Sequence, residues 1–154
     1  MRRFGSGFTI FELLIAVAVV GILTALAMPA FKAQLIKSRR ADAYAALSAV
    51  QLAQERFRAN QPAYASLLTA ATTDNPPGLG LPASTANNFY TITLNGVSAT
   101  GYTALATAVA GSSQASDGNC VQLSVRLNVG TVYYGSAAAG GNIAEPAINP
   151  CWSR

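Results

Sequence analysis

The chain has 154 residues, a formal net charge of +4 and no histidine. This length corresponds to one domain, and so mild a charge does not by itself indicate a nucleic-acid partner. Without histidine, acid–base catalysis would depend on carboxylates, but those beyond the N-terminal segment are scattered rather than paired: Asp42, Glu55, Asp74, Asp117 and Glu145. We therefore expect no enzyme and no cofactor.

The first predicted element is an apolar run from Phe8 to Phe31, in which Glu12 is the only ionisable side chain. The run exceeds the roughly 20 residues that span a bilayer. A carboxylate inside such a segment is costly and usually marks a function. A secretory signal peptide cut after Ala25-Leu26-Ala27 explains neither the length of the run nor Glu12, and a plain signal anchor explains the length but not Glu12.

The stretch "RRFGSGFTIFELLIAVAVVGILTALAMPAF" resembles the N-terminus of the type IV pilin family. In that family a prepilin peptidase cuts after a glycine, here Gly7, and methylates the new terminus, here Phe8. The family's glutamate falls on Glu12, and its helix-loosening residues fall on Gly21 and Pro29. The resemblance implies a leader of residues 1–7, a helix over 8–59 that is transmembrane to about residue 31, and a globular head over 60–154.

This resemblance gives Glu12 a physical role. Cleavage after Gly7 creates a positive amine at Phe8, and Glu12 lies one helical turn further on the same face. When helices bundle in a filament, Glu12 of one subunit can pair with the Phe8 amine of its neighbour. Such a pair would set the axial register, because an unpaired buried charge is heavily penalised. A carboxylate that only reaches the membrane surface is the alternative.

The helix is predicted to form a rod of some 75 Å that Asn60 and Pro62 end, with Pro29 kinking or loosening it near Ala25. Beyond Pro29 an apolar stripe recurs at roughly helical spacing and should pack on the rest of the chain: Ile36, Ala43, Leu47, Val50 and Phe57. The only basic cluster is Lys32, Lys37, Arg39 and Arg40. We interpret the cluster as a solvated or head-group-contacting collar, although the positive-inside rule would then favour the opposite orientation.

The rest of the chain predicts a loop followed by four strands. Residues 61–88 are rich in breakers, and we expect them to carry a short helix around Tyr64 to Ala70 or to contribute a contact surface. Strands are expected over 89–94, 102–109, 121–127 and 131–134, with turns at Asn95-Gly96 and at 128–130. Four antiparallel strands against a long helix make an α+β pilin fold.

Cys120 and Cys151 are the only cysteines. Beyond a bilayer, in an oxidising compartment, such a pair usually forms a disulfide. A free thiol or a metal site is disfavoured, because no histidine or further cysteine completes a ligand set. The pair, with "DGNC" and a terminal "CW", is similar to PilE-like minor pilins of type IVa systems, in which a cysteine pair bounds the C-terminal region.

The resemblance implies a structural subunit, a minor pilin, of a type IV pilus that supports assembly, adhesion, twitching motility or DNA uptake. Its expected partners are other pilin subunits, the prepilin peptidase, the assembly machinery of the inner membrane, and the membrane itself before assembly. The head would lie in the periplasm first and in the extracellular pilus later. A type II secretion pseudopilin and a DNA-receptor pilin remain alternatives. The latter is disfavoured, since after Asn60 only Arg126 and Arg154 are basic.

Overall fold

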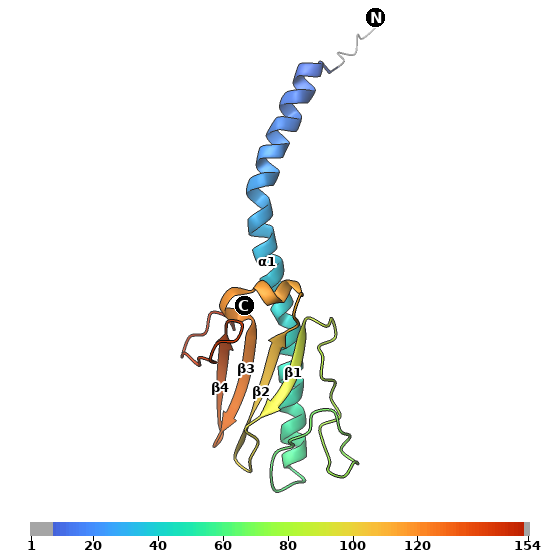
Figure 1. Cartoon of the computed structure of the whole chain (residues 1–154), viewed down its shortest axis with the longest axis vertical. Coiled ribbons are helices and arrows are strands. Elements are labelled where there is room, and N and C mark those ends of the chain that lie inside the picture. The colour runs from blue at the N-terminus through green and yellow to red at the C-terminus, as the bar shows by residue number, and fades with distance from the viewer. Residues whose placement is uncertain (1–7, 153–154) are drawn as a thin grey trace, which may run out of the picture. The chain divides into compact units, whose positions relative to one another are not determined.

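The computed structural model describes residues 8–152 (Figure 1). It divides into two compact units, one ending at Leu35 and the other beginning at Ile36. The helix α1 (Ile10–Arg58) belongs to both units. We call the second unit the head. It contains the later part of α1 and the four strands.

The first unit is an apolar helical segment. Thr9 caps it, since its hydroxyl accepts a hydrogen bond from the Glu12 backbone N–H at 3.2 Å. Thr9 and Glu12 therefore have the Thr-x-x-Glu spacing of a capping box. The helix is continuous through Gly21 and Pro29, so neither residue ends it. With a mean hydropathy of 2.6 over its most apolar window, α1 is long and apolar enough to cross a membrane.

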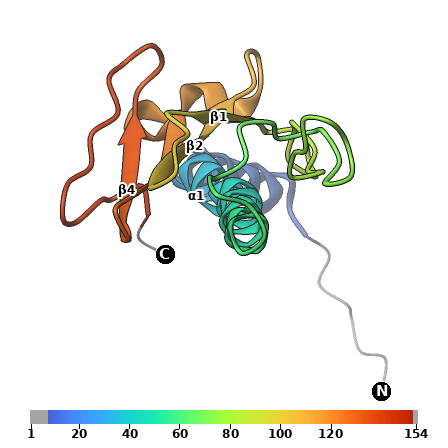
Figure 2. The same cartoon turned by 90° about the horizontal axis from the view of Figure 1, so that it is seen from below.

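Within the head, α1 packs on one face of the sheet (Figure 2). Its buried residues are Ala43, Leu47, Val50 and Gln54, which confirms the centre of the predicted apolar stripe. Gln54 is the polar exception. Its side-chain amide donates to the Ala65 carbonyl and accepts from the Ala65 N–H, both at 2.9 Å, so its polar atoms are satisfied in the core.

The sheet is an antiparallel meander of four strands in the order β1-β2-β3-β4. Its strands are β1 (Tyr90–Asn95), β2 (Gly101–Ala108), β3 (Gln122–Asn128) and β4 (Thr131–Ala137). The prediction of four strands against the helix is confirmed. The prediction of a hairpin turn at Asn95-Gly96 is wrong. Residues 96–100 form a longer loop instead, in which the Ser98 N–H donates to Gly101 O at 2.9 Å.

The predicted short helix around Tyr64 to Ala70 is absent, and residues 59–89 contain no helix. The backbone carbonyl groups of residues 67–70 accept hydrogen bonds from residues 79–81 rather than from a local helix. Leu67 O accepts from Leu79 N–H at 3.0 Å, Leu68 O from Leu81 N–H at 2.9 Å, and Ala70 O from Gly80 N–H at 2.7 Å. Because these carbonyls bond to a distant part of the chain, they cannot form the bonds of a local helix.

The outer face of the sheet is partly covered as well. Ser124 alternates with the buried Leu123 and Val125 along β3, which puts it on the opposite face of the sheet, yet it too is fully buried. Residues 143–145 lie over it, since a side chain at Gly135 would come within 2.4 Å of both Ile143 Cγ2 and Ser124 Oγ. Ala144 also exchanges two backbone hydrogen bonds with Ser136 of β4. The C-terminal region thus covers part of the edge and of the outer face of the sheet at β4.

Tyr102 of β2 leads to a prediction on pH. Its side chain is 2% exposed, and burial raises its pKa to about 12, with smaller contributions from Glu55 and Tyr64. Since this pKa lies above the unfolded value of about 10, the stabilisation is present below pH 10 and is lost as the pH rises toward 12.

We therefore expect the free energy of unfolding to fall across that alkaline range, and to fall less for Tyr102→Phe, which cannot ionise. Denaturant unfolding at a series of pH values measures both. If the free energy of unfolding fell equally with rising pH in the wild type and in Tyr102→Phe, Tyr102 would not be the group responsible.

Candidate assembly and nucleic-acid sites

The N-terminal candidates lie at the exposed start of α1. Gly7, the expected cleavage position, lies outside the described residues. Phe8 is 80% exposed, and Glu12 lies in the first turn of the helix. Within residues 8–152 the Glu12 carboxylate has no ion pair, whereas its backbone N–H is held by Thr9. The carboxylate is thus free to meet a group on another chain, at the helix end where the dipole favours negative charge.

Cys120 and Cys151 form the predicted disulfide, with a Cα–Cα distance of 5.5 Å. Asn149 supports it, since its Oδ1 accepts from the Cys151 N–H at 3.0 Å. Trp152 follows, stacks on Tyr44 of α1 and packs at an angle against Tyr134 of β4, with ring centroids 4.9 and 4.8 Å apart. These contacts fix the end of the described chain to both the helix and the sheet.

The predicted basic collar is wrong for two of its four members. Arg40 makes a bidentate ion pair with Asp117 at 2.7 Å, and both side chains are largely buried, at 13% and 6% exposed. Arg39 donates to the Ser113 hydroxyl and lies over the Phe89 ring, 5.0 Å from its centroid. These two arginines therefore attach the loop between β2 and β3 to α1, while Lys37 remains exposed.

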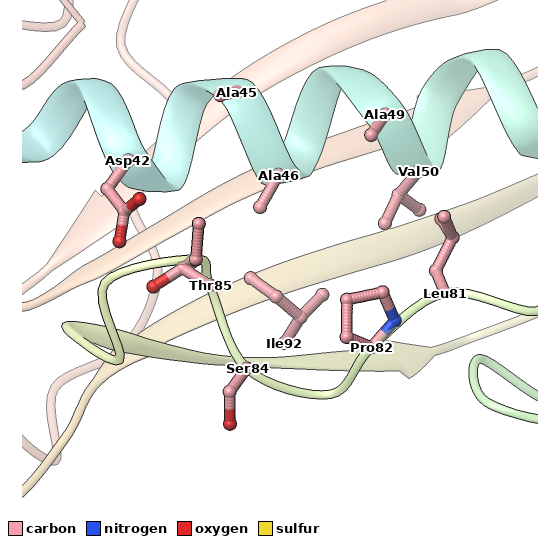
Figure 3. Close-up of a pocket in the computed structure, with 11 residues that line it drawn as sticks. Asp42, Ala45, Ala46, Ala49, Val50, Leu81, Pro82, Ser84, Thr85 and Ile92 are labelled. Carbon is pink, nitrogen blue, oxygen red and sulfur yellow. The ribbon is translucent and has the colours of Figure 1, made fainter.

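The pocket in Figure 3 lies between α1 and residues 81–86 and has a volume of about 170 Å³. Its walls are mainly alanine, leucine and isoleucine side chains, with Asp42 at one end (Figure 3). Asn87 donates to Asp42 Oδ1 at 3.0 Å. The described residues contain no group of three or more His, Cys, Asp or Glu side chains that could hold a metal ion. We assign this pocket no ligand.

A more polar surface lies at the end of the head where α1 finishes. We define the helix-end surface as Arg56, Arg58, the loop 96–100 and the turn 129–130. Arg58 Nε donates to Ala99 O at 3.3 Å, and its Nη1 donates to Gln61 O at 2.8 Å. These partners are neutral carbonyl groups, so Arg58 makes no ion pair with a carboxylate within the described residues. Arg56 lies two residues earlier on α1 and is exposed, on another side of the helix near Leu79 and Leu81.

Three other contacts make the helix-end surface rigid. Tyr64 N–H donates to Ser98 O at 3.2 Å, and Val129 N–H donates to Thr100 O at 2.9 Å. The Arg58 guanidinium also lies over the Tyr64 ring, 6.0 Å from its centroid. The helix end, the loop and the turn are therefore joined. Sequence reasoning missed this surface because it counted cations only after Asn60, although Arg56 and Arg58 lie in the head.

Arg126, by contrast, is already paired. It makes a bidentate ion pair with Glu145 and lies over the Tyr133 ring, 4.2 Å from its centroid. Hydrogen bonds from this guanidinium hold the pKa of Glu145 below its usual value. The pair joins β3 to the C-terminal region, so Arg126 is a weaker candidate for contact with an anionic partner than Arg56 or Arg58.

Two family models match the chain. The model described as "Prokaryotic N-terminal methylation motif" matches residues 2–28. The model described as "Type IV minor pilin ComP, DNA uptake sequence receptor" matches residues 29–124, which is more than half of the chain. A comparison with curated proteins found no match.

These matches agree with the fold and with the N-terminal resemblance. A methylation motif on a long apolar helix fits a pilin that is anchored in a membrane before it assembles into a pilus. The second model identifies a minor pilin and favours the pilus over the secretion pseudopilus. Pilins are structural proteins, and membership implies other pilin subunits and the assembly machinery as partners. The chain belongs to the ComP family of type IV minor pilins.

Proposed function

We propose that this minor pilin is a DNA-binding subunit of a type IV pilus that takes part in DNA uptake. The match of residues 29–124 to the family described as a DNA uptake sequence receptor is the observation that carries the proposal. The helix-end surface supports it, because Arg56 and Arg58 can neutralise phosphates without first breaking an ion pair with a carboxylate.

The path to the filament follows the N-terminal resemblance. The prepilin peptidase removes residues 1–7 and methylates the amine of Phe8. The apolar segment holds the subunit in the inner membrane with its head in the periplasm. Glu12 then pairs with the Phe8 amine of a neighbouring subunit during assembly, and Gly21 and Pro29 allow the helix to adapt. The Thr9 cap supports the role of Glu12, because it keeps Glu12 in the first turn, two residues inside the helix start.

The helix-end surface is small, which limits its electrostatic contribution. Only two arginines are available there, so two phosphate contacts are expected. For duplex DNA the slope of log K against log salt is roughly −0.9 per neutralised phosphate, so we expect a slope of about −2. Binding should therefore be of moderate strength and should depend on hydrogen bonds and apolar contacts as well as on charge.

Fluorescence anisotropy with a labelled mixed-sequence duplex tests the proposal, with the full chain in detergent micelles. For the Arg56→Gln/Arg58→Gln variant we expect affinity at low salt to fall by about tenfold or more, and the salt slope to approach zero. Lys37→Gln is the matched control. It removes an exposed cation outside the surface and should have a smaller effect on affinity.

Arg58 also holds the loop 96–100, so the single variant Arg56→Gln is needed as well. Arg56 makes no ion pair within the described chain, and its loss should reduce the salt slope by about 1 without changing thermal stability. An undetectable affinity of the wild-type chain for duplex DNA at low salt would refute the proposed function. Wild-type affinity in the arginine variants would place the DNA on another surface.

A further inference from the structure

Val129 has a backbone conformation that valine rarely adopts. It forms the turn between β3 and β4 with Gly130, and the two residues have φ values of +47° and +79°. Two positive φ values define a type I′ hairpin turn, for which Asn-Gly is the preferred sequence. A β-branched residue at positive φ is an outlier, because its Cβ substituents crowd the backbone. The first position of this turn is therefore occupied by an unfavourable residue.

Burial does not offset this strain. The Val129 side chain is 73% exposed, so it contributes little to the apolar core. Asparagine at the same position would adopt the positive φ with less strain, and its polar side chain would be hydrated at this exposed site. Strained residues of this kind, which add no packing to the fold, cluster at sites that bind ligands.

The position of Val129 suggests what its role in binding is. The Val129 N–H donates to Thr100 O at 2.9 Å. Ala99, the residue before Thr100, accepts the hydrogen bond from Arg58 Nε. Val129 therefore presents an exposed branched apolar side chain within the helix-end surface. Phosphate-binding arginines position a duplex but carry no sequence information, which comes from contacts with base edges.

We propose that Val129 contacts the C5-methyl group of thymine in the bound duplex. This inference rests on the proposed DNA-binding function and adds a specificity-determining residue to it. Thymine is the base with an exposed apolar group in the major groove, and small apolar side chains are its usual partners there. The turn places Val129 at the tip of a hairpin, and two-stranded ribbons are among the elements that the major groove admits.

Replacing thymine by deoxyuridine in the duplex tests this directly, since deoxyuridine lacks only the methyl group. With the full wild-type chain, we expect affinity for the thymine duplex to exceed that for the deoxyuridine duplex by about fourfold, the value of one buried methyl group. For Val129→Asn we expect equal affinity for the two duplexes and a higher melting temperature, because asparagine suits the turn. Val132→Asn, which alters another exposed valine of the same hairpin, should keep the preference for thymine.

The possible failures can be told apart. Equal wild-type affinity for the two duplexes, or a preference that persists in Val129→Asn, would overturn the role of Val129 while arginine-dependent binding still supported the DNA function. Absence of binding to either duplex would remove both. A lower melting temperature of Val129→Asn would contradict the premise that valine is strained in the turn.

Discussion

Replacing Glu12 by alanine should exclude the subunit from filaments while leaving it in the membrane. The apolar run that inserts into the bilayer is unchanged or slightly more apolar in Glu12→Ala, so insertion is retained. The variant lacks the carboxylate that would meet the Phe8 amine of a neighbouring subunit. Because an unpaired amine in the low-dielectric bundle costs several kcal/mol, incorporation should fall by roughly a hundredfold or more.

The measurement is the ratio of this subunit in sheared filaments to that in membranes, determined by quantitative immunoblotting. Glu12→Gln is the matched control, since it keeps the size and polarity of the side chain but not its charge. We expect Glu12→Gln to fail as well, and Glu12→Asp to recover part of the incorporation. Normal incorporation of Glu12→Ala would show that the carboxylate has no role in assembly.

The second large effect concerns the stability of the head. Arg40→Met should lower its free energy of unfolding by roughly 3–5 kcal/mol, because Asp117 would remain buried without its partner. The damage should be concentrated in the loop between β2 and β3, which contains Asp117 and leads to Cys120. Denaturant unfolding of the full chain in detergent, followed by tryptophan fluorescence from Trp152, measures the loss.

The double variant Arg40→Met/Asp117→Leu provides the control for this effect. Removing both charges leaves no unpaired carboxylate, and similar replacements of buried pairs are often neutral. We expect the double variant to recover most of the stability lost in the single one. A double variant as unstable as Arg40→Met would mean that packing of the arginine stem, rather than its charge, supports the loop.

The sequence predicted most of the secondary structure, and the reasons can be named. β3 alternates apolar and polar residues, which is the pattern of a strand and led to its prediction over residues 121–127. The helix was predicted to within about a residue of its end, because Asn60 and Pro62 are strong stop signals. The disulfide was predictable because only one pairing is possible between two cysteines.

What the sequence did not predict depends on contacts between distant residues. Ser124 is buried because residues 143–145 fold back over it, and no local pattern indicates that return. Residues 64–70 do not form a helix because their carbonyl groups bond to residues 79–81. Both cases depend on where a segment without helix or strand finds its hydrogen-bond partners, which local propensity does not encode.

The same limit explains the errors in the candidate sites. Four nearby cations looked like one basic collar, but only the fold shows that Arg40 faces Asp117 and Arg39 faces Ser113. The helix-end surface combines residues that are about seventy positions apart in the chain, and Val129 reveals its strain only through its φ value. Charge counts along a sequence cannot separate paired from unpaired arginines.

The most direct test of pilin processing and assembly is the intact mass of this subunit recovered from sheared surface filaments and, in parallel, from membranes. We expect a filament species that begins at methylated Phe8 and is two hydrogens lighter than the reduced chain, because Cys120 and Cys151 are joined. A chain that begins at Met28, or an uncut chain found only in membranes, would contradict this expectation. Either result would mean a secreted or simply anchored head, and Glu12 would have no role in assembly.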